Sequence, residues 1–95
     1  MLLGADFVDA PLPLLGRIEA AEDNLIECLS HRPDEVQGVV TLVTCNRAEI
    51  YLETSDRDRG LQWAIGTIAE ASHLNRAEVA QVFRVVTGSS VMRHL

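Results

Sequence analysis

The chain has 95 residues and a formal net charge of −6, with eight basic side chains that are all arginine. This length provides one domain with a modest core, and the acidic balance excludes the basic face of a free-standing nucleic-acid-binding protein. No apolar run approaches a membrane span and no basic-then-apolar leader opens the chain, so we expect a cytoplasmic protein. Cys28 and Cys45 are expected to be free thiols, and without a CxxC or clustered His and Cys we expect no metal site.

The first third of the chain predicts a strand followed by a helical region. Residues 1–8 form the expected strand, which a proline-containing segment ends. Apolar residues recur at helical spacing over residues 18–29, and Gly16 is expected to separate a short leading turn from a main helix that begins near Ala21. Cys28 lies beside the apolar stripe of that helix, so we expect a packed thiol that behaves as a small hydrophobe.

Residues 39–53 predict a β-hairpin with a polar tip, around which the rest of the chain is organised. Residues 39–43 (VVTLV) have the length and β-branched content of a buried strand. Residues 48–53 alternate, which predicts a second strand with Ala48, Ile50 and Leu52 on one face. Thr44-Cys45-Asn46-Arg47 between them places a thiol at the turn, and loops on a rigid scaffold often carry functional residues.

The second half of the chain predicts two helices and a strand. Residues 54–60 are charged and rich in turn residues, so we expect a solvated loop there. A helix follows over residues 61–72, and residues 75–78 (Asn to Glu) have the spacing of a capping box. Residues 82–86 predict a fourth strand. Serines at the start of residues 89–95 can cap a last helix, which the end of the sequence cuts short.

The predicted order β-α-β-β-α-β-α is typical of an α+β fold. We expect a ferredoxin-like βαββαβ antiparallel sheet with helices on one face, plus the start of a C-terminal helix. Residues 1–95 are expected to form a single domain, and the last helix without a stop signal indicates that this domain is truncated.

The stretch Thr44–Tyr51 (TCNRAEIY) resembles the signature of the glutamyl-tRNA reductase catalytic domain. In that signature a Thr-Cys-Asn-Arg run precedes Glu, a β-branched or Leu residue, and Tyr; Ala48 stands here where Thr is usual. Further matches extend the resemblance over the whole chain, at Leu3-Gly4, Ala10-Pro11, Gly38-Val39-Val40 and His94-Leu95. The chain is therefore similar to the N-terminal part of that catalytic domain.

The resemblance implies a chemistry for the motif. Cys45 would attack the ester of glutamyl-tRNA and hold glutamate as a thioester, which NADPH reduces to glutamate-1-semialdehyde for tetrapyrrole (porphyrin, heme) biosynthesis. Arg47 would bind the glutamyl carboxylate, and as a cation it can favour the Cys45 thiolate. Thr44 and Asn46 would hydrogen-bond the glutamyl group, and His94 would act as polariser or proton donor to the leaving group.

The resemblance also implies parts that this chain does not contain. No GxGxxG occurs in the sequence, so NADPH would be bound by a domain absent from this chain. We therefore expect no reductase activity from the fragment alone, and a homodimer only for the full-length protein.

Departures from the family leave two alternatives open. Residues 7–9 (Phe-Val-Asp) replace a usual segment that carries His and Thr, and Leu15-Gly16 stand where Arg-Glu is usual, as in an inactive paralogue. Ferredoxin-like domains also serve as small binding or regulatory modules, in which Cys45 would be a turn residue only. Whether His94 reaches Cys45 is open too, because the fourth strand should end opposite the hairpin tip.

Four further polar residues are assigned structural roles. Glu49 and Tyr51 are expected either on the outward face of their strand or paired with an arginine. His31 and His73 are expected at the solvated ends of helices.

Overall fold

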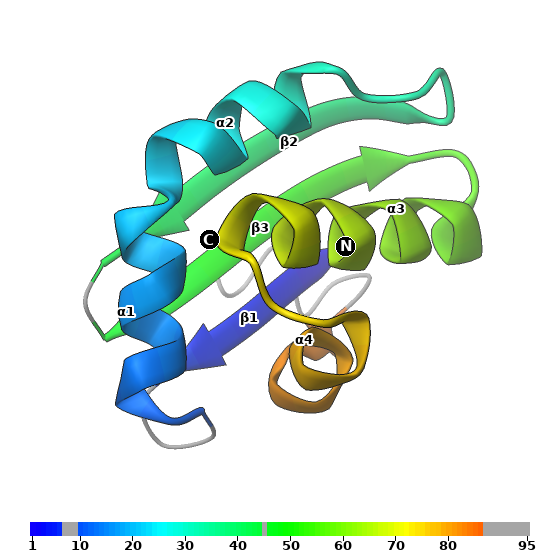
Figure 1. Ribbon diagram of the computed structural model, residues 1–95. Helices are drawn as coiled ribbons and strands as arrows, with labels where there is room; N and C mark the ends of the chain where they lie inside the picture. Colours follow the sequence, from blue (N-terminus) through cyan, green and yellow to red (C-terminus); the bar gives the residue numbers. More distant parts are fainter. Residues whose placement is uncertain (7–9, 45, 87–95) are drawn as a thin grey trace.

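The computed structural model describes residues 1–6, 10–44 and 46–86. Its elements in chain order are β1 (Leu2–Asp6), α1 (Leu12–Ala20), α2 (Glu22–Ser30), β2 (Val36–Val43), β3 (Arg47–Thr54), α3 (Arg57–Ser72), α4 (Arg76–Val82) and β4 (Arg84–Val86). The strands form one sheet in the order β2-β3-β1-β4, and every neighbouring pair is antiparallel (Figure 1). The predicted α+β fold with a four-stranded antiparallel sheet is confirmed.

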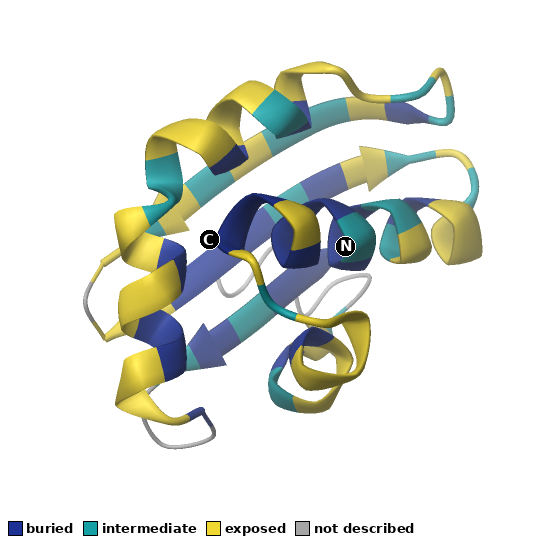
Figure 2. Ribbon diagram, in the orientation of Figure 1, coloured by how far each residue is buried: buried dark blue, intermediate teal, exposed yellow. Residues whose placement is uncertain are grey.

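The hydrophobic core lies between the sheet and a layer of helices. Ala48, Ile50 and Leu52 of β3 are all buried, as their alternation predicts. Ile18 of α1 and Ile68 of α3 reach the same core from the helices. Figure 2 shows that α1 and α2 carry exposed residues on their outer side and buried residues where they meet the sheet. Burial of aliphatic side chains in this layer therefore fixes the strands that carry the hairpin.

The helical region of the first half consists of two helices, and the predicted break at Gly16 is wrong. Gly16 lies inside α1, whereas the chain bends at Ala21 between α1 and α2. An isolated glycine costs a helix only about 1 kcal/mol, so it need not end one. The expected main helix from about residue 21 is α2, and Cys28 on it is partly buried against the core, which confirms the packed thiol.

Two expected boundaries in the second half are also wrong. Residues 57–60, predicted as loop, form the first turn of α3, because the Asp56 carboxylate accepts a hydrogen bond from the Arg59 backbone N–H at 3.0 Å and so caps the helix. Val82, predicted as strand, is the last residue of α4. The capping box at Asn75 and Glu78 is confirmed, with both of its reciprocal hydrogen bonds present.

Strand β2 is an edge strand, which corrects the expectation that residues 39–43 form a buried one. Val40 is 63% exposed and Leu42 is 46% exposed; they pair with Tyr51 and Glu49, on the face of the sheet opposite the core residues Ile50 and Leu52. When helices cover just one face of an antiparallel sheet, every second side chain of an edge strand faces solvent. The apolar run at residues 39–43 therefore reflects the β-propensity of its residues and does not indicate that the strand is fully buried.

Parts of the prediction fall on residues that the structure does not describe. These are the departures at residues 7–9, the thiol of Cys45, and the last helix with His94. Among the residues described, no helix is long and apolar enough to cross a membrane.

Candidate functional site

The polar tip of the predicted hairpin is a tight connection between β2 and β3. The Thr44 backbone N–H donates to the Arg47 carbonyl oxygen at 2.7 Å, and the Arg47 N–H donates back to the Thr44 carbonyl at 3.4 Å. These two hydrogen bonds enclose a two-residue turn. The predicted hairpin is thereby confirmed, and Cys45, the first residue of this turn, lies outside the described residues.

The Thr44 side chain helps to hold the turn. Its hydroxyl oxygen accepts a hydrogen bond from the Asn46 backbone N–H at 3.3 Å, an arrangement that serine and threonine often make in turns. Thr44, Asn46 and Arg47 are all exposed. The structure therefore brings three of the five predicted site residues together at a solvent-accessible tip.

Arg47 begins β3 and lies on the face of the sheet opposite the core. Its side chain is 54% exposed, and Nη1 lies 3.4 Å from Glu49 Oε1. An ion pair with so exposed a partner contributes only about 0–1 kcal/mol to stability. A guanidinium has five N–H donors, so a single contact with Glu49 leaves a planar fork that suits a second carboxylate.

Glu49 is buried although it points away from the core. It is 4% exposed, and in the sheet it stands between Leu42 of β2 and Gly4 of β1. A Cβ at Gly4 would lie 3.9 Å from Glu49 Cγ, an ordinary van der Waals distance, so the two residues are in close contact across the strands. The predicted pairing of Glu49 with an arginine is confirmed by its contact with Arg47.

The pKa of Tyr51 is shifted by its neighbours on the sheet face that carries Arg47 and Glu49. Burial raises the pKa of the phenol, and the Glu49 carboxylate raises it further through its charge and a hydrogen bond, while the Arg47 guanidinium lowers it. Asp6 of β1 stands directly opposite Arg47 in the ladder. The predicted cation at the tip thus contacts the Glu49 carboxylate on its own strand and is paired in register with a second acidic residue, Asp6, on the next strand.

The sequence predicted that Glu49 lies on the outward face or pairs with an arginine, but it placed neither Glu49 nor Asp6 in the site. The spacing of Arg47 and Glu49 on one strand face was an available signal, because residues i and i+2 share a face. The position of Asp6 depends on the register between β1 and β3, for which the sequence offers no local signal.

The other predicted residues lie elsewhere. β4 pairs Arg84 with Gly4 and Val86 with Leu2, so it runs away from the tip, as expected, and His94 is outside the described residues. The thiol of Cys28 lies on α2, with Sγ 4.0 Å from Asn24 Oδ1. The solvated helix ends predicted for His31 and His73 are confirmed as exposed C-cap positions of α2 and α3.

Among the described residues we see neither a group of metal ligands nor the usual dinucleotide site. Over residues 1–6, 10–44 and 46–86 there is no group of three or more His, Cys, Asp or Glu side chains placed to hold a metal ion. All strand pairs in the sheet are antiparallel, whereas the usual dinucleotide site is built at the end of parallel strands with a glycine-rich turn.

Comparison with known proteins adds a family and several relatives. The family model described as "Glutamyl-tRNAGlu reductase, N-terminal domain" matches residues 3–95. The glutamyl-tRNA reductase of Paenarthrobacter aurescens strain TC1 is 32% identical over 98% of this chain, and that of Cyanothece sp. strain PCC 7425 is 30% identical over 99%. The enzyme of Cyanophora paradoxa is 37% identical over 63%. The chain spans 22% of the length of the first two relatives and 14% of the third.

Proposed function

The chain belongs to the glutamyl-tRNA reductase N-terminal domain family, and from that membership we propose that it carries the acyl-transfer half of the reductase reaction. The Cys45 thiolate attacks the carbonyl carbon of the glutamyl ester on tRNA. A carbon–sulfur bond forms, the bond to the tRNA ribose oxygen breaks, and that oxygen takes up a proton. The product is a glutamyl thioester on Cys45, which is more reactive towards hydride than the ester it replaces.

The proposed role of Arg47 is to bind the substrate's side-chain carboxylate and to favour the thiolate. Its exposed guanidinium, two residues after Cys45, supports both parts of this role, because a cation near a thiol stabilises the ionised form. Thr44 and Asn46 would contribute hydrogen bonds to the glutamyl group from the same tip. His94 would assist departure of the tRNA oxygen, as the family resemblance implies.

The observation that carries the proposal is the position of Thr44, Asn46 and Arg47, all exposed, at a hydrogen-bonded connection between β2 and β3, in a chain that matches the family over residues 3–95. The whole protein would then use NADPH, bound outside this chain, to release glutamate-1-semialdehyde for tetrapyrrole synthesis. We propose a cytoplasmic homodimer for that whole protein. The strand order with helices on one face also supports the ferredoxin-like class for this domain.

The test separates acyl transfer from reduction. The 95-residue chain is incubated with tRNA charged with labelled glutamate, without NADPH, and the protein is precipitated with acid. We expect acid-stable label that thiol reagents release, that disappears in Cys45→Ala, and that persists in the matched variant Cys28→Ala. Label that survives Cys45→Ala, or no label on any chain, would contradict the proposal.

A second measurement decides between a nucleophile and an ordinary turn residue. The rate of iodoacetamide alkylation is followed against pH for both cysteines in one sample, with the partly buried Cys28 as internal control. We expect Cys45 to react faster than Cys28, and more slowly after Arg47→Gln. A Cys45 no more reactive than Cys28 would instead favour a binding module or an inactive paralogue.

A further inference from the structure

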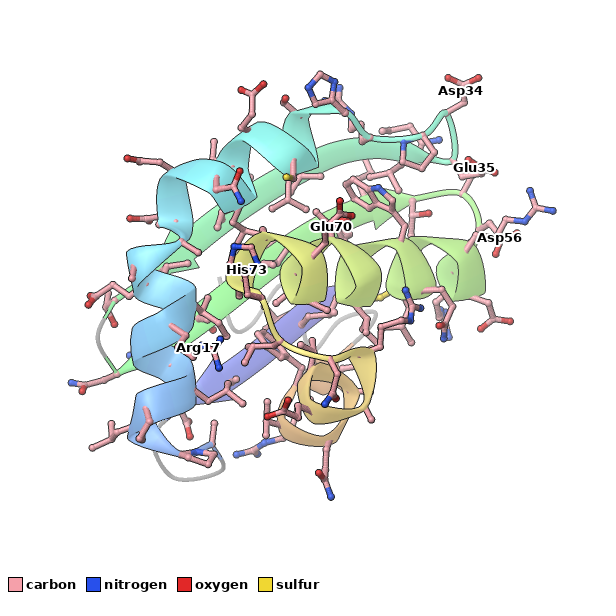
Figure 3. All side chains as sticks on the ribbon, in the orientation of Figure 1. Arg17, Asp34, Glu35, Asp56, Glu70 and His73 are labelled. Carbon is pink, nitrogen blue, oxygen red and sulfur yellow. The ribbon has the colours of Figure 1, made fainter. Side chains whose placement is uncertain are left out.

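A pocket of about 360 Å³ lies outside the candidate site, where α1, α2 and the C-terminal end of α3 meet, and it opens to solvent. Four polar side chains line it: Arg17 from α1, Asn24 from α2, and Ser72 and His73 from the end of α3, with alanines between them. Figure 3 labels Arg17 and His73, which approach this junction from two different elements. None of these residues belongs to the motif at the hairpin tip.

The buried Ser72 hydroxyl is the observation that points to a ligand. Ser72 is 3% exposed, and its Oγ has no hydrogen-bond partner among the described residues. A serine inside a helix commonly bonds to the carbonyl four residues before it, but Ser72 does not. A buried hydroxyl without a partner is destabilising and calls for an explanation. Ser72 lines the adjoining pocket, but its Oγ is closed off from solvent, so contact with a bound group requires the Ser72 side chain to rotate towards the pocket.

The pocket is electrostatically suited to an anion although it adjoins a helix C-terminus. The carbonyl oxygens there already have partners: Arg17 Nη2 donates to His73 O at 3.0 Å, and Asn24 Nδ2 donates to Ala71 O at 3.2 Å. The backbone N–H of Leu74 donates to Ala69 O at 2.9 Å. These hydrogen bonds offset the partial negative charge of the helix end, which otherwise disfavours an anion.

The side chains that line the pocket are mainly donors. The Arg17 guanidinium has four N–H groups besides the one on His73 O, and the Asn24 amide has a second N–H. His73 adds an imidazole, and Ser72 adds the hydroxyl. None of the described residues that line the pocket is acidic.

The backbone of His73 is consistent with a use for its side chain. This C-cap residue has φ of 56°, a left-handed conformation that glycine adopts most easily. A histidine is present where glycine would cost less strain.

We propose that this pocket binds a small oxyanion, the phosphate or carboxylate group of a ligand, with Arg17 as the cationic partner and the Ser72 hydroxyl as the buried one. The pocket shares no residue with the site proposed for acyl transfer. Anion binding in the pocket is therefore independent of acyl transfer, and either could be absent without affecting the other.

The test is a titration of the 95-residue chain with inorganic phosphate, and in a second arm with acetate, at constant ionic strength with chloride as the background anion. Backbone amide shifts are followed by NMR. We expect saturable shifts in the millimolar range at Asn24, Ser72, His73 and Leu74. Tighter binding of phosphate would identify a phosphate site, and tighter binding of acetate a carboxylate site. Shifts spread over the exposed arginines, or shifts that do not saturate, would overturn the proposal.

Variants separate binding from folding. Arg17→Gln should weaken binding about tenfold or more, because a charge-assisted hydrogen bond is lost. Arg57→Gln removes one charge from an exposed position outside the pocket and should leave affinity unchanged. His73→Gly should raise the melting temperature by relieving the left-handed backbone, yet weaken phosphate binding. Equal effects of Arg17→Gln and Arg57→Gln would overturn the proposal.

The Ser72→Ala variant keeps the test informative if Arg17→Gln loosens the end of α3. Removal of a buried hydroxyl without a partner should raise the melting temperature of the free protein and weaken phosphate binding about threefold. A lower melting temperature with unchanged affinity would mean that the hydroxyl has a structural partner, and the proposal would fail.

Discussion

Two glycines inside helices should respond to alanine in opposite directions. Gly16 lies in α1 with nothing within 4 Å of the position that a Cβ would occupy. Alanine is favoured over glycine in a helix by up to about 1 kcal/mol, so Gly16→Ala should stabilise the protein by about 0.5–1 kcal/mol. Gly60 lies in the first turn of α3 and is buried. A Cβ there would lie 2.9 Å from Thr54 Oγ1 and 3.0 Å from Thr54 Cγ2.

Thr54 cannot easily move away from that Cβ. Its Oγ1 lies 2.8 Å from Glu35 O and 2.9 Å from Asp56 O, and it accepts a hydrogen bond from the Asp56 backbone N–H at 3.2 Å. Overpacking of a fixed site costs about 1–3 kcal/mol, which exceeds the gain in helix propensity. We therefore expect Gly60→Ala to destabilise the protein by about 1 kcal/mol, roughly 2 kcal/mol below Gly16→Ala.

The assay is urea unfolding followed by the fluorescence of Trp63, the only tryptophan in the chain, which lies partly buried on α3. Thermal unfolding gives a second measure, since 1 kcal/mol corresponds to about 4–8 °C in a domain of this size. A Gly60→Ala variant as stable as Gly16→Ala would refute the close packing of the first turn of α3 against Thr54 at the end of β3. A destabilised Gly16→Ala would refute a helix that continues through residue 16.

Three further predictions concern the hairpin face and the helix ends. The only tyrosine, Tyr51, should titrate above the ordinary phenol pKa in an absorbance titration, and Glu49→Gln should lower that pKa. Because the folded state holds the phenol proton more tightly, the contribution of Tyr51 to stability should be complete at neutral pH and be lost as pH rises through its raised pKa; stability constant across that range would contradict this. Asn75→Ala should lower the free energy of unfolding by about 1 kcal/mol in urea, through loss of the capping box, and an unchanged midpoint would contradict the cap. Arg47→Lys should slow thioester formation in the labelled-glutamate assay more than it slows Cys45 alkylation, because it keeps the charge and loses the fork; equal slowing would argue against carboxylate binding.

The features that the sequence predicts well are those set by neighbours along the chain. The hairpin follows from the alternation over residues 48–53, and the capping box from Asn75 and Glu78 three positions apart. Asp56 also precedes its helix directly and caps it, but it stands among charged residues that are typical of a solvated loop. Composition alone therefore predicts a loop over residues 57–60, whereas the capping aspartate before them marks the start of a helix.

The features that the sequence does not predict depend on the position of an element in the sheet. The exposure of Val40 and Leu42 follows from the edge position of β2. A short apolar run in the sequence does not distinguish an edge strand from a central one. The pocket at Arg17 and Ser72 joins residues more than fifty positions apart, so no spacing rule could reveal it.

Electrostatics limits what this domain can contribute to recognition of a tRNA. The chain carries a net charge of −6 and no lysine, and two of its arginines are already paired, Arg47 with Glu49 and Arg59 with Glu35. Affinity for a polyanion comes mainly from unpaired cations that displace counterions, and a net negative domain repels the phosphate backbone at long range. If the proposed function holds, the domain would therefore carry out acyl transfer at the hairpin tip and would contribute little to the affinity for tRNA. The tight connection between β2 and β3 lies at one end of the sheet. It could contact the charged end of a tRNA while the rest of this acidic domain stays distant from the phosphates.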